Sequence, residues 1–302
     1  MTTAKPTTKQ TVTWSDLPAW QRDNHYIHTH YRPASSSYLK SLLSLTYLHN
    51  ESVNIYTHLI GSLTFLLLPM ITHKSLTTRH ATATVEDALV FTAFFGSAVA
   101  CLGMSAAYHT ISNHSHRVAV WGNKLDYLGI VALIWGSFIP VLFYAFQEDV
   151  RLMRWYGGMI TSLGVATAGV ATQQRFRTPA LRPFRAAMFV AMGLSAVVPV
   201  VHAARLYGVQ RLRASAALDW VVLQGVLYIV GAAVYAARFP ERTWPGAFDV
   251  WGSSHQIFHV LVVAAAAVHL VGLVKAFDFV HERRGGVAKY VVLAEKGTWY
   301  GA

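Results

Sequence analysis

The stretch that decides the fold is residues 88–116, ALVFTAFFGSAVACLGMSAAYHTISNHSH, which contains no aspartate, glutamate, lysine or arginine. A helix of about 20 apolar residues crosses the hydrocarbon core of a bilayer, so this stretch predicts a transmembrane span. Six other stretches of 18 residues or more are also free of charge: 55–72, 127–147, 155–172, 186–204, 220–237 and 250–274. The chain is therefore predicted to be an all-α membrane protein, a bundle of seven transmembrane helices.

The composition fits a single membrane domain. Of the 302 residues, 54% are hydrophobic and 13% are charged, with 25 basic residues against 14 acidic ones. The basic residues lie between the spans, which favours anionic lipid headgroups over nucleic acid as their partner. The single cysteine, Cys101, lies inside a span, which excludes a disulfide framework and a cysteine-based zinc finger. We expect an integral, multi-pass protein, and the sequence does not distinguish the plasma membrane from endomembranes.

Three segments are expected along the chain. Residues 1–50 form an N-terminal arm without the apolar run of a signal peptide. Leu39, Leu42 and Leu43 recur at near-helical spacing within it, which predicts a short interfacial helix before span 1, with a longer span 1 as the alternative. Residues 51–280 form the seven-span domain, which contains the candidate site described below, and residues 281–302 form a C-terminal tail.

Charge gives only a weak indication of orientation, because basic residues divide almost evenly between the two faces. The loop between spans 4 and 5 has Arg175, Arg177, Arg182 and Arg185 without an acidic neighbour. By the positive-inside rule this loop is cytosolic. The arm is then cytosolic too, and the tail lies on the opposite side.

An odd number of spans fixes which helix ends share a face of the membrane. The start of span 1, the end of span 2 and the starts of spans 3 and 7 meet on one face. These ends hold most of the side chains that can do chemistry: Asn54, His58, Ser105, His109, Asp126, His255 and His259. We interpret this convergence as one site.

Histidines at three of these ends have the pattern of a zinc site. His255 and His259 lie four residues apart in a predicted helix, so both imidazoles project from one face. Such a pair is also compatible with two packed or hydrogen-bonded histidines, but His109 lies at a matching depth on another span and favours the metal. Three neutral nitrogen ligands leave zinc an open fourth position, as in catalytic sites, for a water that could attack a carbonyl.

Asp126 and Ser105 are the predicted catalytic residues beside that water. Asp126 would hold or deprotonate the water, and Ser105 would be a further hydrogen-bond partner. A carboxylate is costly within the membrane, and a divalent cation would compensate its charge. The alternative for Asp126 is the N-cap of span 3. For Asn54 and His58, with Glu51 just before them, helix capping and hydrogen bonding between helices are favoured over metal ligation.

Three sequence motifs resemble those of the progestin and adipoQ receptor family, which is related to the hemolysin III proteins. They are Glu51-Ser-Val-Asn54-Ile-Tyr-Thr57-His58; Ser105-Ala-Ala-Tyr108-His109 with Leu125-Asp126-Tyr127; and Pro245-Gly246-Ala-Phe248-Asp249 followed by Ser254-His255-Gln256-Ile-Phe258-His259. The resemblance covers residues 14 to 275 in order, and is strongest to the fungal zinc-homeostasis, osmotin-receptor-like members and to adiponectin receptors. One departure is His30-Tyr31-Arg32, where relatives commonly have Gly-Tyr-Arg. This departure puts a glycine-dependent turn of the arm in question.

The resemblance implies seven helices with a cytosolic N-terminus and a zinc ion, Zn²⁺, near the cytosolic leaflet. It implies His109, His255 and His259 as ligands, Ser105 and Asp126 around the water, and Glu51, Asn54, Thr57 and His58 as structural residues near the site. The family is also similar to alkaline ceramidases, which implies hydrolysis of a lipid amide.

Two functions follow as hypotheses. The first is a zinc-dependent intramembrane hydrolase of a ceramide-like amide, with a membrane lipid or sphingolipid as substrate and a link to lipid signalling and metal homeostasis. The alternative is a seven-transmembrane signalling receptor with a structural zinc and an extracellular ligand. A transporter is disfavoured because the two halves show no repeat.

Overall fold

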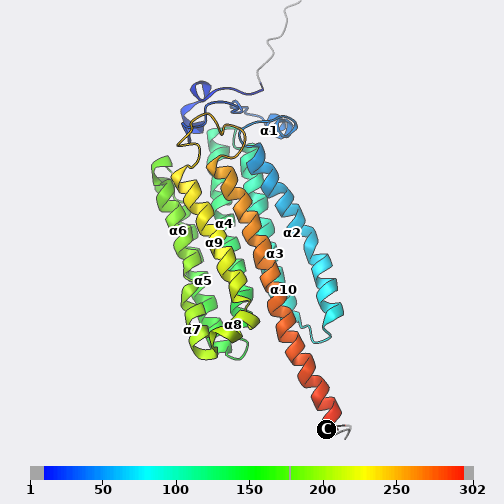
Figure 1. Ribbon diagram of the computed structural model, residues 1–302. Helices are drawn as coiled ribbons and strands as arrows, with labels where there is room; N and C mark the ends of the chain where they lie inside the picture. Colours follow the sequence, from blue (N-terminus) through cyan, green and yellow to red (C-terminus); the bar gives the residue numbers. More distant parts are fainter. Residues whose placement is uncertain (1–9, 177, 296–302) are drawn as a thin grey trace, which may run out of the picture.

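A computed structural model describes residues 10–176 and 178–295, and within them the chain forms ten α-helices joined by short connections (Figure 1). Residues 1–9 of the predicted arm, Arg177 of the basic loop and residues 296–302 of the predicted tail lie outside this range. The helices are α1 Tyr38–Leu43, α2 Ser52–Arg79, α3 Val85–Ile111, α4 His116–Ala145, α5 Val150–Ala171, α6 Arg182–Leu194, α7 Val197–Tyr207, α8 Val209–Ser215, α9 Leu218–Ala237 and α10 Ser254–Glu295.

Six stretches of the described chain are long and apolar enough to cross a membrane: α2, α3, α4, α6 together with α7, α9, and Ser254–Gly285 of α10. The chain is therefore an integral, multi-pass membrane protein. The helix α5 coincides with the predicted span 155–172 and packs beside α4 and α6. It is not among the six, and it has Arg151 and Arg154 in its first two turns.

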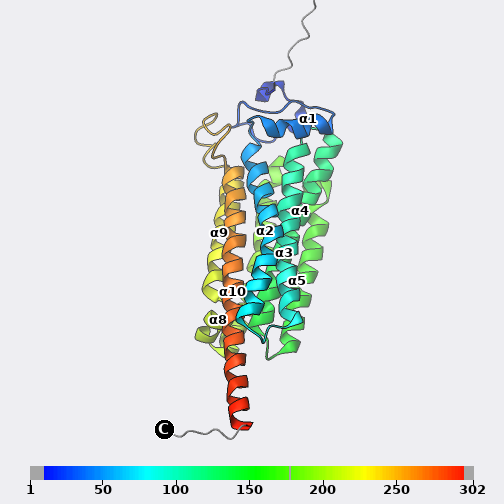
Figure 2. The ribbon, with the colours of Figure 1, turned by 90° about the vertical axis from the view of Figure 1, so that its right-hand side faces the viewer.

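The arm and α1 lie across one end of the bundle, as Figures 1 and 2 show. The connection between α9 and α10 lies at the same end, and α10 runs to the opposite end and projects beyond the other helices. The separate helix α1 confirms the predicted short helix before span 1. Its apolar side chains Leu39, Leu42 and Leu43 are exposed. The longer span 1 is wrong, because residues 47–51 separate α2 from the turn that follows α1.

Predicted spans 2 and 3 meet at different boundaries in the structure. The stretch 88–116 ends as a helix at Ile111, and α4 begins at His116, eleven residues before the predicted 127. Ser115 is the N-cap of α4, and its hydroxyl accepts a hydrogen bond from the Val118 amide. The charge-free criterion missed the first turns of α4 because charged residues are tolerated where a helix emerges into the headgroup region. Asp126 therefore lies within α4, and its interpretation as an N-cap is wrong.

Predicted span 5 is divided into α6 and α7 at Ser195 and Ala196. Pro199 follows in the first turn of α7, where a residue without an amide hydrogen leaves no helical hydrogen bond unmade. Predicted span 7 begins four residues late, at Ser254, and α10 continues to Glu295, past the predicted tail boundary at residue 281.

A close contact between α3 and α4 sets the centre of the bundle. Gly122, Gly129 and Gly136 recur every seven residues on α4 and face α3. A Cβ at Gly129 would lie 2.9 Å from the Cα of Cys101, so only glycine allows the two backbones this approach. The contact fixes the register of α4 against α3, which holds His109 and Asp126 at the same end.

Candidate metal centre

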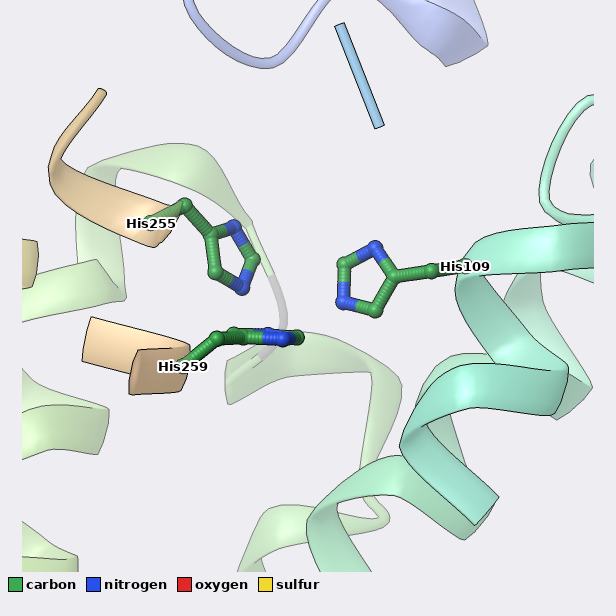
Figure 3. A group of neighbouring side chains, drawn as sticks. All are labelled: His109, His255 and His259. Carbon is green, nitrogen blue, oxygen red and sulfur yellow. The ribbon is translucent and has the colours of Figure 1, made fainter. Parts of the chain in front are cut away.

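Three histidines from two helices face one point at the arm end of the bundle. His109 lies in the last turn of α3, and His255 and His259 lie in the first two turns of α10. Each offers a ring nitrogen, and these nitrogens lie within 4.8 Å of one another. Figure 3 shows the three imidazoles directed toward a common space. Within the described part of the chain, this is the one group of histidine, cysteine or carboxylate side chains close enough to hold a metal ion.

In two of the rings, hydrogen bonds from Nδ1 leave Nε2 unprotonated and able to bind a metal. His109 Nδ1 donates to Glu51 Oε2 at 2.7 Å, and His259 Nδ1 donates to the Asn54 carbonyl at 3.1 Å. Because both acceptors are oxygens without hydrogen, each Nδ1 holds the proton and each Nε2 has a free lone pair. His109 Nε2 is buried and has no protein partner. Histidine ligands commonly have such a carboxylate or carbonyl on the other ring nitrogen, so the residues fit a zinc ion.

The end of α3 is held by Arg32 of the arm. Its guanidinium donates to the carbonyls of His109 and Thr110 and to Ser44 Oγ at 2.9 Å. These carbonyls have no helical partner, because α3 ends at Ile111. Burial lowers the pKa of Arg32 to about 10, so the side chain remains cationic at neutral pH and opposes the negative end of the helix dipole. The sequence alone gave no role to Arg32 beyond the resemblance.

The turn that leads to Arg32 is present although its glycine is absent. His30 adopts a left-handed conformation with φ of 62°, a region that glycine enters at no steric cost. The Thr29 hydroxyl and His30 Nδ1 lie 2.8 Å apart and form a local hydrogen bond. The turn therefore forms in the left-handed region with histidine at the position where relatives commonly have glycine.

The start of α10 is held by two side chains that sequence analysis missed. Glu241, fully buried in the α9–α10 connection, accepts hydrogen bonds from the amide and hydroxyl of Ser254. Gln256 accepts from the Gly252 amide at 2.6 Å and donates to the Asn50 carbonyl at 3.1 Å. These contacts fix the first turn of α10, from which His255 projects. Their partners are distant in sequence or belong to the backbone, so no local pattern reveals them.

Polar side chains at the start of α2 support the rings. Asn54 Nδ2 donates to Glu51 Oε2 at 2.6 Å, and Thr57 Oγ1 donates to the Val53 carbonyl at 2.7 Å. The His58 ring stacks on His259 with centroids 3.7 Å apart. None of these residues belongs to the group of three histidines. Hydrogen bonding and stacking between helices are their observed roles.

Asp126 and Ser105 lie beside the centre on facing helices. Both are buried, Asp126 on α4 and Ser105 on α3, and their side chains are hydrogen-bonding neighbours. Asp126 does not belong to the group of three nitrogens. It faces the same cavity as His255 and His259. The structure thus places a carboxylate next to the centre without making it a ligand of the candidate metal.

A cavity of about 760 Å³ extends from the centre along the bundle. Its walls come from α4, α6, α7, α9 and the start of α10, and it reaches Leu212, Ala216 and Leu218 toward the other end. Most of its lining is apolar, including Leu133, Phe138 and Phe146. Such a cavity is within the size range of small-molecule sites and is suited to a long apolar ligand with a polar end at the histidines.

Comparison with known proteins identifies the family. Residues 46–270 match the haemolysin-III related family. The ADIPOR-like receptor IZH2 of Saccharomyces cerevisiae is 43% identical over 278 residues, which cover 92% of this chain and 87% of that protein. The adiponectin receptor protein of Drosophila melanogaster is 42% identical over 262 residues, which cover 86% of this chain and 58% of that protein.

A plant relative, heptahelical transmembrane protein 4 of Arabidopsis thaliana, is 35% identical over 334 aligned positions, which cover 86% of each chain. The present chain thus corresponds to most of the yeast and plant proteins and to less than two thirds of the fly receptor. The matched region runs from before Glu51 to beyond His259 and so includes the whole metal centre. The chain therefore belongs to the haemolysin-III related family of membrane proteins, among its progestin and adipoQ receptor-like members.

Proposed function

We propose that this protein is a zinc-dependent intramembrane hydrolase that cleaves a ceramide-like lipid amide, with effects on lipid signalling and metal homeostasis. One observation carries the proposal. Three histidines with inward-facing nitrogens stand at one end of a long apolar cavity, beside a buried carboxylate that is not part of their group. A structural zinc would be expected to have a fourth protein ligand instead.

The chemistry divides between the metal and two side chains. A zinc ion bound by His109, His255 and His259 would supply an acidified water and polarise the amide carbonyl. Asp126 accepts the proton of the attacking water and transfers it to the departing nitrogen. Ser105 hydrogen bonds to Asp126 and keeps its carboxylate directed at the centre. The products are a fatty acid and an amine, which for a ceramide is a sphingoid base.

The cavity accounts for a lipid substrate. An acyl chain that follows the walls of α4, α6, α7 and α9 would bury its methylenes, at about 0.8 kcal/mol each. Its carbonyl would then lie at the histidines, where the cavity becomes polar. The rate enhancement therefore depends on a tail that positions the reacting group.

The proposal includes seven spans and a cytosolic N-terminus. The arm and the end of α10 lie at opposite ends of the bundle, which supports an odd number of crossings. The helix α5 has 22 residues and is about 33 Å long, enough to cross the hydrocarbon core. The plant relative is named for seven helices.

The second candidate is a signalling receptor with a structural zinc, and the names of the yeast and fly relatives favour it. In that case the cavity would hold a regulatory lipid, and Asp126 would not act as a general base. The two candidates therefore differ in what the carboxylate of Asp126 does.

The test is Asp126→Asn, which preserves size and most hydrogen bonding but removes the base. We expect zinc to remain bound and release of sphingoid base from ceramide to fall by at least about 10²-fold, as for loss of a general base. The exposed carboxylate Asp219, changed to asparagine, is the control. Turnover in Asp126→Asn equal to that of the control would remove Asp126 from the mechanism. No turnover in the unmodified protein at several acyl lengths would favour the receptor.

A further inference from the structure

The arm is tied to the mouth of the cavity through Asp23, whose carboxylate pairs with two arginines. Asp23 pairs with Arg182, the first residue of α6, through a single guanidinium nitrogen, Nη2. The Asp23 side chain is 51% exposed, whereas that of Arg182 is 5% exposed. Arg238, at the end of α9, donates to the Asp23 carbonyl at 2.7 Å, and its Nη2 lies 3.6 Å from the Asp23 carboxylate. Ala19, Trp20, Arg22 and Asp23 together cover part of the cavity.

The other side of Arg182 faces the metal centre. Its guanidinium lies 4.4 Å from the centre of the Tyr235 ring, and that ring lies 5.1 Å from the His255 ring. Arg182 lines the cavity, and its Nε is buried without a hydrogen-bond partner. A buried N–H without a partner is costly and uncommon, and this one belongs to a fixed cation beside the site.

We propose that Arg182 is a binding site for a carboxylate, which Asp23 occupies while the arm is closed and the carboxylate of a fatty acid occupies when residues 19–23 lift. The inference rests on the proposed function, because amide hydrolysis is the reaction that produces a fatty acid in this cavity. It adds a defined ligand group and a role for the arm.

The geometry of arginine supports this exchange. A carboxylate binds best to two parallel N–H groups of a guanidinium, and the Nε–Nη2 edge offers such a pair. Asp23 accepts only from Nη2 of Arg182, so the Nε–H of this edge has no hydrogen-bond partner while the arm is closed. A fatty acid carboxylate formed at the histidines would be anionic in an apolar cavity and would be stabilised only by a charged partner. Arg182 is a permanently charged group between the centre and the mouth.

The arm can lift here without losing its other anchor. Asp249 accepts hydrogen bonds from the amides of His28 and Thr29, both at 2.9 Å, and Arg32 holds the end of α3. These contacts lie beyond the segment that covers the cavity. Lifting residues 19–23 breaks the bonds from Arg238 to the Asp23 carbonyl and from Gln21 to the Arg32 carbonyl, but it leaves the Arg32 guanidinium on α3, so the metal centre keeps its support.

The experiment measures equilibrium binding of palmitate and of hexadecan-1-ol, which has the same chain length but no charge and no bond to hydrolyse. We expect Arg182→Gln to weaken palmitate binding by about tenfold or more, as for a lost charged hydrogen bond, and to leave hexadecanol binding unchanged. Arg182→Lys keeps the positive charge but lacks the two parallel N–H groups of the guanidinium, so it should give an intermediate loss of palmitate affinity. It also serves if Arg182→Gln does not fold.

Removing the Asp23 carboxylate, which competes with palmitate for Arg182, should change the palmitate affinity in the opposite direction. Asp23→Asn should tighten palmitate binding about two- to fivefold, the range of a half-exposed ion pair, and should speed hydrogen exchange in residues 18–23. Asp16→Asn is the matched control, because this exposed carboxylate of the same arm accepts hydrogen bonds from Thr13 and does not line the cavity, and it should change neither quantity.

Equal palmitate affinity in the unmodified protein and both Arg182 variants, or in Asp23→Asn and Asp16→Asn, would overturn the inference. Ceramide turnover on the same preparations separates it from the proposed function. Turnover without a preference for palmitate over hexadecanol overturns the carboxylate site and leaves the hydrolase. A palmitate preference that depends on Arg182, without turnover, supports the site and overturns the hydrolase.

Discussion

The hydrogen bond between Glu51 and His109 joins the start of α2 to the end of α3, and through it a carboxylate acts on a candidate ligand. Glu51→Gln keeps the shape but removes the charge that fixes the His109 tautomer. We expect zinc affinity to fall about 10- to 100-fold, as for other partners of metal-bound histidines. The measurement is zinc retention against a competing chelator.

Two further variants set the lower and upper limits of the zinc retention expected for Glu51→Gln. His259→Ala removes a ligand and should lose most of the zinc and lower the melting temperature, because metal binding is coupled to folding. Glu86→Gln changes an exposed carboxylate at the other end of α3 and should behave as the unmodified protein. If His259→Ala retained its zinc, the site would lie elsewhere.

His49, buried between α1 and α2, makes stability depend on pH. Burial, and next the charge of Arg32, lower the pKa of His49 to about 3, against about 6.5 in the unfolded chain. Between these values the unfolded chain takes up a proton that the folded protein does not. Stability is therefore lost as pH falls below 6.5, by at most about 2 kcal/mol at pH 5.

The check is the melting temperature of His49→Gln between pH 6.5 and 5. We expect a shallower decline than in the unmodified protein, and no such change in His25→Gln, at an exposed position of the arm. Parallel declines in all three proteins would assign the acid sensitivity to other groups.

At the scale of elements, the register of α3 against α4 depends on the three glycines of α4. In Gly129→Ala the new Cβ would meet the Cα of Cys101 at 2.9 Å, and two backbones must separate to admit it. Overpacking of this kind costs about 1–3 kcal/mol, and it would also shift Asp126 relative to His109. We expect a lower melting temperature and reduced turnover with zinc still bound.

Gly158→Ala on α5 is the control, since nothing lies within 4 Å of its added Cβ. It should be neutral or slightly stabilising, because alanine favours a helix more than glycine does. A loss in Gly158→Ala as large as in Gly129→Ala would show that propensity or lipid contact, and not the α3–α4 approach, sets the cost.

For the molecule as a whole, the membrane topology depends on whether α5 crosses the bilayer. With Cys101 replaced by alanine, single cysteines at Glu148 and Arg175 would flank α5 on either side. We expect a membrane-impermeant maleimide to label them from opposite faces of sealed vesicles, with Arg175→Cys on the same face as Arg242→Cys. Labelling of both flanking positions from one face would leave six crossings and place the termini together.

The sequence predicted the helices of the bundle because a bilayer demands length and apolarity, which are local properties. It also brought His109, His255 and His259 together, because a span count assigns helix ends to faces. The helix boundaries were predicted less well, because α4 includes Arg117 and Lys124, which the search for charge-free stretches excluded. The contacts that hold His109 in place could not be predicted from local sequence. Glu51 and Arg32 lie 58 and 77 residues before His109, and contacts over such separations leave no local pattern.

The origin of the three ligands has a consequence for how the protein is made. His109 on α3 leaves the ribosome well before its partners on α10, which follow only after the six intervening helices. During that interval a newly inserted α3 exposes a lone imidazole that cannot retain a metal. The ion can be captured by all three histidines only once α10 has packed beside α3. A loaded centre therefore marks a chain in which α10 has been inserted into the membrane and packed beside α3.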